Sequence, residues 1–133
     1  MESTNPLAVV RRYFDALAAK DFATVAGMFA DDIVWHQPGG NRFSGTHRGS
    51  AAVNEMIGGM MTVSEGSFEL VLTAAPMANG ALVAVPVHFT ATRDGAAMAQ
   101  DGVDLLRIEG GRIAEAWLFS ADPEAEDAFW GTA

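Results

Sequence analysis

The sequence contains no cysteine, which excludes disulfide bonds and thiolate metal sites. Half of its 133 residues are hydrophobic, yet none of its apolar runs approaches the roughly 20 residues that cross a bilayer as a helix. The first residues, MESTNPLAVVRRYF, are acidic and polar where a secretion signal has a basic segment and an apolar core. We therefore expect a cytoplasmic protein.

Basic residues are also few, with 8 Lys and Arg against 17 Asp and Glu and a formal net charge of −9. Such a charge disfavours binding to a phosphate backbone or to an anionic membrane surface, so we expect neither nucleic acid nor membrane as a partner. Internal repeats, low-complexity tracts and linkers are lacking as well. Residues 1–133 should form one domain around a single core.

Three amphipathic helices are predicted in the first half of the chain, because apolar residues recur there at spacings of three and four. Their buried sides are predicted to be Leu7, Val10, Phe14 and Leu17, then Phe22, Val25, Ala26 and Phe29, then Val53, Met56, Ile57 and Met60. Asn5, Asp21 and Ser50 are suitable N-caps. Tyr13 lies at the edge of the first apolar stripe, so its hydroxyl should point toward whatever that helix covers.

The predicted strands begin with residues 33–37, where alternation puts Trp35 and Gln37 on one face and His36 on the other. After a long loop, residues 38–50, and the third helix, the apolar period changes to two. Strands at residues 68–77, 81–92, 96–109 and 112–120, joined by turns rich in Gly, then predict an antiparallel meander. An acidic tail, residues 124–130, should fold back through its two aromatic residues.

One carboxylate stands out in this pattern. The Gly110-Gly111 turn predicts that Asp104 pairs with Trp117, and the Asp94-Gly95 turn predicts that it pairs with Val85. The same register puts Glu115 opposite Leu106 on that face, whose other residues are predicted to be mainly apolar, with Val85, Val87, Phe89, Leu106, Trp117 and Phe119. Burying a carboxylate in such surroundings costs free energy unless it is hydrogen-bonded, protonated or has a role in binding or catalysis. Asp104 is therefore the centre of the functional question.

The other face of the last hairpin is predicted to carry Val103, Leu105, Ala114, Ala116 and Leu118. This face is too apolar for solvent, and we expect a homodimer to form through it. The fold class expected from these elements is α+β, with three N-terminal helices packed against one curved antiparallel sheet. A bent sheet closed by helices forms a cone whose interior is a pocket.

Four segments carry a resemblance to a known family: VVRRYFDALAAKD, ADDIVWHQPGG, GSAAVNEMI and VDLLRIEGGRIAEAW. With them the chain resembles the nuclear-transport-factor-2-like superfamily, and within it the SnoaL-like polyketide cyclases and the ketosteroid isomerases. The resemblance implies a cystatin-like α+β roll. It is specific for the fold and weak for the reaction, because this fold hosts isomerases, cyclases, dehydratases, epoxide hydrolases and non-catalytic binders.

The resemblance also suggests roles for single residues. Tyr13 stands where ketosteroid isomerases place the tyrosine of the oxyanion hole, and Asp104 where they place a protonated aspartic acid. The position of their carboxylate base holds Gln37, whose amide cannot accept a proton at neutral pH. SnoaL-like cyclases use an acidic residue on the late strands as the base, and Asp104 can supply it.

These observations predict a small-molecule cyclase or isomerase that uses carboxylate acid/base chemistry next to a carbonyl of an apolar, polyketide- or steroid-like substrate. No cofactor and no metal are expected. The predicted catalytic residues are Asp104, Tyr13 and Gln37, and the predicted substrate-binding residues are Trp35, Met56, Met60, Val87, Phe89, Leu106, Trp117 and Phe119.

The alternatives are an epoxide hydrolase of the same fold, a dimeric module that binds a hydrophobic ligand, and a domain whose Asp104 is only structural. His36, His47 and His88 are the other candidate bases, but alternation turns His36 and His88 away from Asp104. The same register pairs His88 with Asp101. The three histidines are too scattered to predict a metal site.

Overall fold

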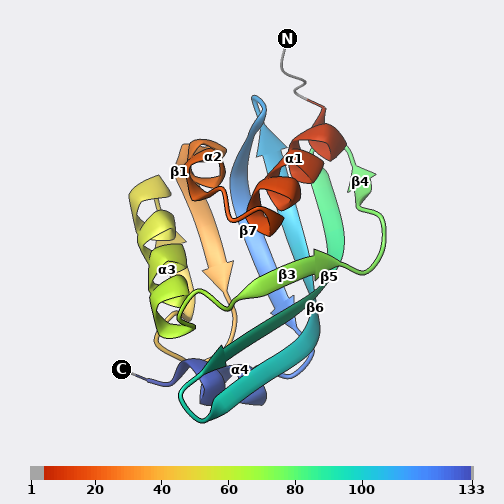
Figure 1. Cartoon of the computed structure of the whole chain (residues 1–133). Helices are drawn as coiled ribbons and strands as arrows, with labels where there is room; N and C mark the ends of the chain where they lie inside the picture. Colours follow the sequence, from red (N-terminus) through yellow and green to blue (C-terminus); the bar gives the residue numbers. More distant parts are fainter. Residues whose placement is uncertain (1–4, 133) are drawn as a thin grey trace.

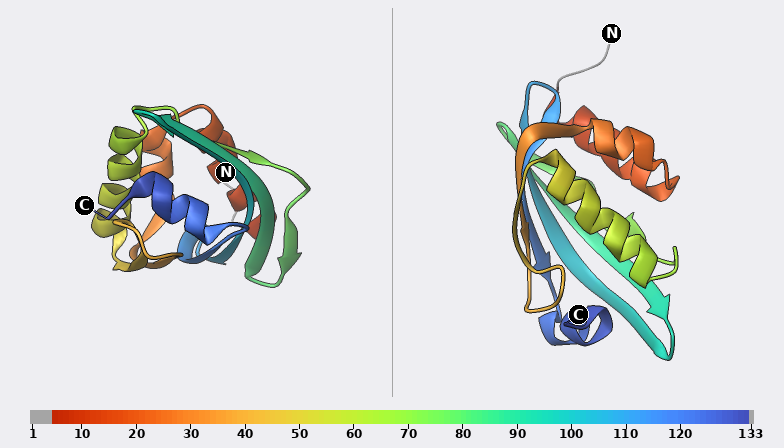
Figure 2. Two further views of the ribbon diagram at one scale, coloured as in Figure 1. Left: turned by 90° about the horizontal axis from the view of Figure 1, so that it is seen from below. Right: turned by 90° about the vertical axis from the view of Figure 1, so that its left-hand side faces the viewer.

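The computed structural model describes residues 5–132 as one α+β unit (Figure 1). Its elements are α1 (Pro6–Ala18), α2 (Phe22–Gly27), β1 (Phe29–Gln37), β2 (Gly45–Arg48), α3 (Ser50–Val63), β3 (Glu69–Leu72), β4 (Met77–Asn79), β5 (Leu82–Arg93), β6 (Ala96–Glu109), β7 (Arg112–Ser120) and α4 (Pro123–Trp130). Helices α1, α2 and α3 lie on one side of a strongly curved sheet, and α4 lies across its lower end (Figure 2). In the described residues, no helix has both the length and the apolar character needed to cross a bilayer.

The N-terminal helices start where the cap residues predict. The Asn5 side chain accepts a hydrogen bond from the Ala8 backbone N–H at 3.3 Å, and Asp21 does the same for Thr24 at 3.3 Å. Helix α3 differs slightly, because its N-cap is Gly49 and Ser50 is its first residue. The apolar stripes of these helices cover the inner face of the sheet.

The sheet follows the order β2-β1-β7-β6-β5-β3, and β4 also pairs with β5. Neighbouring strands are antiparallel except β1 and β7, which are parallel. This mixed, curved sheet with helices on one side confirms the expected α+β class. A parallel neighbour for β7 was not predicted, because it depends on a long connection through α3 and five strands rather than on a turn.

The register between β5 and β6 is the one predicted from the Asp94-Gly95 turn. Val85 lies opposite Asp104 and His88 lies opposite Asp101. Gly95 has a φ of 69°, which suits glycine in a tight hairpin turn. The inward residues of β5, namely Val83, Val85, Val87, Phe89 and Ala91, are all buried.

The predicted register between β6 and β7 is wrong beyond the turn. Gly110 and Gly111 do form the turn, and Ile108 pairs with Ile113, but the next pair is Arg107 with Glu115. Ala114 is therefore an extra residue, a β-bulge, and every later side chain of β7 moves to the opposite face. Asp104 lies opposite Leu118 instead of Trp117.

The bulge exchanges the two faces of β7. Ala116 is fully buried and Leu118 packs against the core, although both were expected outside. Trp117 and Phe119 were expected inside, and they instead share the outer face with Val103.

Four further predictions need correction. Phe29 starts strand β1 rather than lying on the second helix, and the predicted strand 68–77 is broken into β3 and β4. The long loop 38–50 contains β2, which pairs with β1. The acidic tail folds back as expected, but it does so as helix α4, with Phe129 and Trp130 buried.

Candidate functional site

A cavity of about 80 Å³ lies between the inner face of the sheet and helices α1, α3 and α4. It is several times larger than the roughly 10–15 Å³ that one water molecule needs by the same kind of measure. Aromatic and aliphatic side chains from every layer form most of its wall, among them Phe22, Trp35, Met60, Phe68, Phe89 and Trp130. The polar groups of the wall are few, and they converge from α1, β1, β6, β7 and α4.

Asp104 on β6 faces this cavity and is only 7% exposed. Within residues 5–132 no hydrogen bond joins its carboxyl group to another side chain or to the backbone, and neither oxygen is sealed off from the cavity. Burial, together with the negative charge of Glu126, raises the pKa of Asp104 to about 7. A carboxyl group with this pKa is present in both protonation states near neutral pH.

Tyr13 on α1 reaches the cavity from the helical side, as its place on the apolar stripe predicts. Its ring packs edge-on against Phe14 at 5.1 Å between centroids and lies 5.9 Å from Phe29. Burial, reinforced by the charge of Asp104, raises the pKa of the Tyr13 hydroxyl above its usual range. The hydroxyl is therefore protonated and able to donate a hydrogen bond into the cavity.

Gln37 at the end of β1 is the third polar group, and its neighbour Trp35 fixes its orientation. The indole Nε1 donates a hydrogen bond to Gln37 Oε1 at 3.0 Å. Since an indole N–H can only donate, this bond fixes the orientation of the amide: the oxygen faces Trp35, and the NH₂ group makes no hydrogen bond within residues 5–132. Sequence reasoning left Gln37 as donor or acceptor, and this orientation favours the donor role.

Helix α4 adds polar groups that the sequence analysis missed. Glu126 lines the cavity and is 4% exposed, and the neighbouring Ser120 and Trp130 line it as well. A signal for this was present: Asp122-Pro123 is a typical N-cap and first position, and Trp130 follows Glu126 by four residues, on the same helix face. Because the sequence analysis described residues 124–130 only as an acidic tail, it did not predict that Glu126 faces inward.

The predicted substrate-binding residues separate into three groups. Trp35, Met60 and Phe89 line the cavity, whereas Phe119 borders it from β7 and is 56% exposed on the outer face. Met56, Val87 and Leu106 are buried in the surrounding core without lining it. Trp117 was placed wrongly because of the bulge: it lies on the outer face, where its ring stacks on His36 at 5.6 Å.

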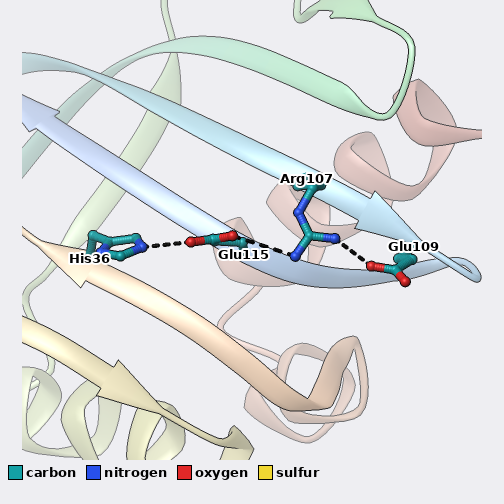
Figure 3. A network of polar contacts seen from close by, with 4 residues as sticks. All are labelled: His36, Arg107, Glu109 and Glu115. Atoms are coloured by element: carbon teal, nitrogen blue, oxygen red, sulfur yellow. Dashed lines mark hydrogen bonds and ion pairs between the residues drawn. The ribbon is translucent and has the colours of Figure 1, made fainter.

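None of the three histidines lines the cavity. His36 Nε2 lies 2.7 Å from Glu115 Oε2 and begins a polar chain that continues through Arg107 to Glu109 (Figure 3). His88 Nδ1 lies 2.8 Å from Asp101 Oδ1, and His47 Nε2 lies 2.7 Å from the Phe43 carbonyl oxygen. Among the described residues, no group of three or more His, Asp or Glu side chains is arranged to hold a metal ion.

Comparison with known proteins agrees with this architecture. The family model described as SnoaL-like domain matches residues 10–116. An uncharacterized protein of Mycobacterium tuberculosis is 32% identical over 125 residues, which cover 93% of this chain and 95% of that protein.

Solved structures show the same fold. A Xanthomonas campestris protein of unknown function with a cystatin-like fold is 46% identical, with a TM-score of 0.91 and 96% and 98% of the two chains covered. An epoxide hydrolase of M. tuberculosis, described as LEH-like, is 21% identical, with a TM-score of 0.73 and 97% and 90% coverage. The chain belongs to the SnoaL-like family, and its fold is the cystatin-like α+β roll.

Proposed function

We propose that this protein is an enzyme that moves a proton at a carbon atom next to the carbonyl group of an apolar substrate. The observation that carries the proposal is the Asp104 carboxyl group, which is buried in an apolar cavity, has no hydrogen-bond partner in the described part of the chain and has a pKa of about 7. A proton-transfer group works best when its pKa lies near the working pH. A merely structural carboxylate would normally have a partner when buried.

The other polar groups of the cavity fit this chemistry. When a carboxylate removes a proton next to a carbonyl, negative charge develops on the carbonyl oxygen. The Tyr13 hydroxyl and the Gln37 NH₂ are hydrogen-bond donors that line the same cavity, and donors held in place in a water-poor site stabilise such charge strongly. Asp104 is thus the proton-transfer group, and Tyr13 and Gln37 bind the enolate oxygen.

The wall of the cavity indicates the substrate class. It is formed mainly by aromatic and aliphatic side chains, which favour a flat, apolar molecule with few polar atoms. A polyketide- or steroid-like carbonyl compound has this character. Cyclisation and isomerisation both begin with the same proton removal, so the residues above serve either reaction.

The direct test is hydrogen–deuterium exchange at the acidic carbon of β-tetralone, a bicyclic aromatic ketone, followed by NMR in heavy water. The wild-type protein should accelerate exchange, and Asp104→Asn should lose about 10²–10⁴-fold of that acceleration. Asp101→Asn is the matched control, because Asp101 lies on the same strand but faces outward against His88. Equal exchange rates in wild type and Asp104→Asn would reject the proposal, and tight binding of the ketone without exchange would favour a binding module.

Epoxide opening is a second candidate, because Asp104 can accept a proton from a water molecule while the Gln37 amide hydrogen-bonds the epoxide oxygen. A solved protein with this fold is an epoxide hydrolase. Styrene oxide is a suitable probe. Diol formation that depends on Asp104, in the absence of ketone exchange, would select this reaction.

We also propose that the protein is a homodimer through the outer face of the sheet. Val103 is 38% exposed and Phe119 is 56% exposed on this face, next to Trp117. Sedimentation at micromolar concentration should give a dimer, and Val103→Asp should shift it to monomer because a charge would be buried without a partner. Ala51→Asp, at an exposed position of helix α3 on the opposite side of the sheet, is the control and should leave the dimer intact. A monomeric wild-type protein would contradict the proposal.

A further inference from the structure

Helix α4 brings a second carboxylate into the cavity that contains Asp104. We propose that Glu126 is a second proton-transfer residue of this site, and that Glu126 and Asp104 share a single proton, with Glu126 as the ionised partner and Asp104 as the protonated one. The inference rests on the proposed function and refines the role of Asp104 in it: Glu126 removes the proton from carbon, and Asp104 supplies a proton to the carbonyl oxygen. Glu126 provides the cavity with a second ionisable group able to accept a proton, which the Gln37 amide cannot do.

The position of Glu126 is fixed from several directions. Ser120 Oγ donates a hydrogen bond to Glu126 Oε1, and Trp130 Nε1 donates one to Oε2 at 3.4 Å. The helix itself is anchored by Asp127, whose Oδ1 accepts hydrogen bonds from the Gly40 N–H and the Asn41 amide, each at 2.9 Å. The carboxylate is therefore held at the cavity wall rather than moving freely in solvent.

The charges around the pair leave the two carboxylates without a neutralising cation. Among the described residues that line the cavity there is no Lys, Arg or His, and the other ionisable group is Tyr13, which stays neutral. Asp127 is a further negative charge near Glu126, and the Arg93 guanidinium is directed to the Trp130 carbonyl oxygen at 3.2 Å. Two carboxylates that line one apolar cavity without a cation are expected to ionise one after the other, as a coupled pair, and the charge of Glu126 is one of the causes of the raised Asp104 pKa.

The hydrogen bonds decide which carboxyl group keeps the proton. Both oxygens of Glu126 accept a hydrogen bond, which stabilises its ionised form, whereas no donor reaches Asp104 within the described residues. Burial raises the pKa of Glu126 as well, but these two donors oppose that rise. Asp104 accordingly takes up the first proton of the pair.

This arrangement provides an acid and a base at once. Glu126 takes a proton from the carbon next to the carbonyl, so the C–H bond breaks and its electron pair forms the carbon–carbon double bond of the enol. The carbonyl oxygen takes the proton of Asp104, and the O–H bond of Asp104 breaks. Return of a proton from Glu126 to another carbon, and of the oxygen-bound proton to Asp104, completes an isomerisation without net change in the enzyme.

The test is an NMR titration of the side-chain carboxyl carbons in the full-length, ligand-free protein between about pH 4 and about pH 9. The variant Glu126→Gln keeps the shape and removes the charge, so the Asp104 midpoint should move to lower pH. Glu124→Gln removes the same charge from the exposed side of the same helix and should leave that midpoint in place. An Asp104 midpoint that is equal in wild type and Glu126→Gln would overturn the proposal.

The wild-type titration gives an answer even if Glu126→Gln does not fold. A pair that shares one proton titrates in two steps, and each carboxyl signal should respond at both midpoints. Two independent single-step curves would overturn the inference. This outcome is separate from the failure of the proposed function, because the titration needs no substrate: a coupled pair without exchange of β-tetralone protons would reject the function and keep the pair.

Discussion

The two faces of the sheet treat carboxylates in opposite ways. On the inner face, Asp104 has no hydrogen-bond partner in the described chain and its pKa is raised to about 7. On the outer face, Glu115 is paired with His36 at 2.7 Å and with Arg107 at 3.4 Å, and its pKa is lowered, chiefly by the hydrogen bond with His36 (Figure 3). The two acids lie on adjacent strands, β6 and β7. The different directions of their pKa shifts therefore come from the groups around each side chain and not from its strand.

The difference shows which face is built for chemistry. A carboxylate that is hydrogen-bonded by a histidine and an arginine, as Glu115 is, is stabilised as an anion and gains little from binding a proton. A buried carboxylate without a partner is costly, and that cost is removed when it binds a proton or a polar substrate atom. The inner face therefore carries the reactive group, while the outer face carries charges that are already compensated.

The largest effect expected from this contrast is on the pH dependence of stability. Folded Asp104 keeps its proton up to about pH 7, whereas an ordinary aspartate loses it near 3.8. Between these values the folded state binds more protons than the unfolded state, so this group makes the free energy of unfolding fall as pH rises. The full loss is up to about 4 kcal/mol, at about 1.4 kcal/mol per pH unit.

Asp104→Asn removes this titration and should be more stable than wild type at about pH 8, with little difference near pH 4. Urea unfolding of both proteins at the two pH values measures the change. Asp101→Asn is the control, since Asp101 is paired with His88 on the outer face and lacks the buried environment. If the wild-type protein were instead more stable than Asp104→Asn at pH 8, the ionised Asp104 carboxylate would have to be stabilised by an interaction, and the contrast between the two faces would be wrong.

The sequence predicted some parts of this contrast correctly, and the two hairpins show why. The Asp94-Gly95 turn determines a regular ladder, so counting from it puts Val85 opposite Asp104, as found. The Gly110-Gly111 turn was equally clear, but the bulge at Ala114 changed the face of every later β7 residue. Alanine fits either face of a strand, so nothing in the local pattern marks the extra residue.

Glu126 was missed for a different reason. Charged residues near a chain end normally face solvent, and composition alone gives no indication that one of them is buried. Its burial depends on Trp130, which is fully buried against Phe43 and Phe129 and so turns one side of α4 inward. Long-range packing of this kind decides the site but leaves only a weak trace in the sequence.

The smallest effect, and the opposite sign, is expected on the outer face. The lowered pKa of Glu115 means that its ion pairs stabilise the fold above the pKa of an unfolded glutamate and that this contribution is lost as pH falls through the lower, folded value. Glu115→Gln should therefore cost about 0.2–1 kcal/mol near pH 7 and almost nothing in acid, because partly exposed ion pairs contribute little.

Urea unfolding at low and high salt checks this, since screening should shrink the wild-type advantage. Glu109→Gln is the control: Glu109 ends the same chain but is far more exposed, so it should cost less than Glu115→Gln. Glu115→Gln could instead stabilise the protein at pH 7, as Asp104→Asn is expected to do at pH 8. In that case the hydrogen-bonding partners of Glu115 would not explain the difference between the two faces. Burial alone would then have to account for both acids, although Glu115 is by far the less buried of the two.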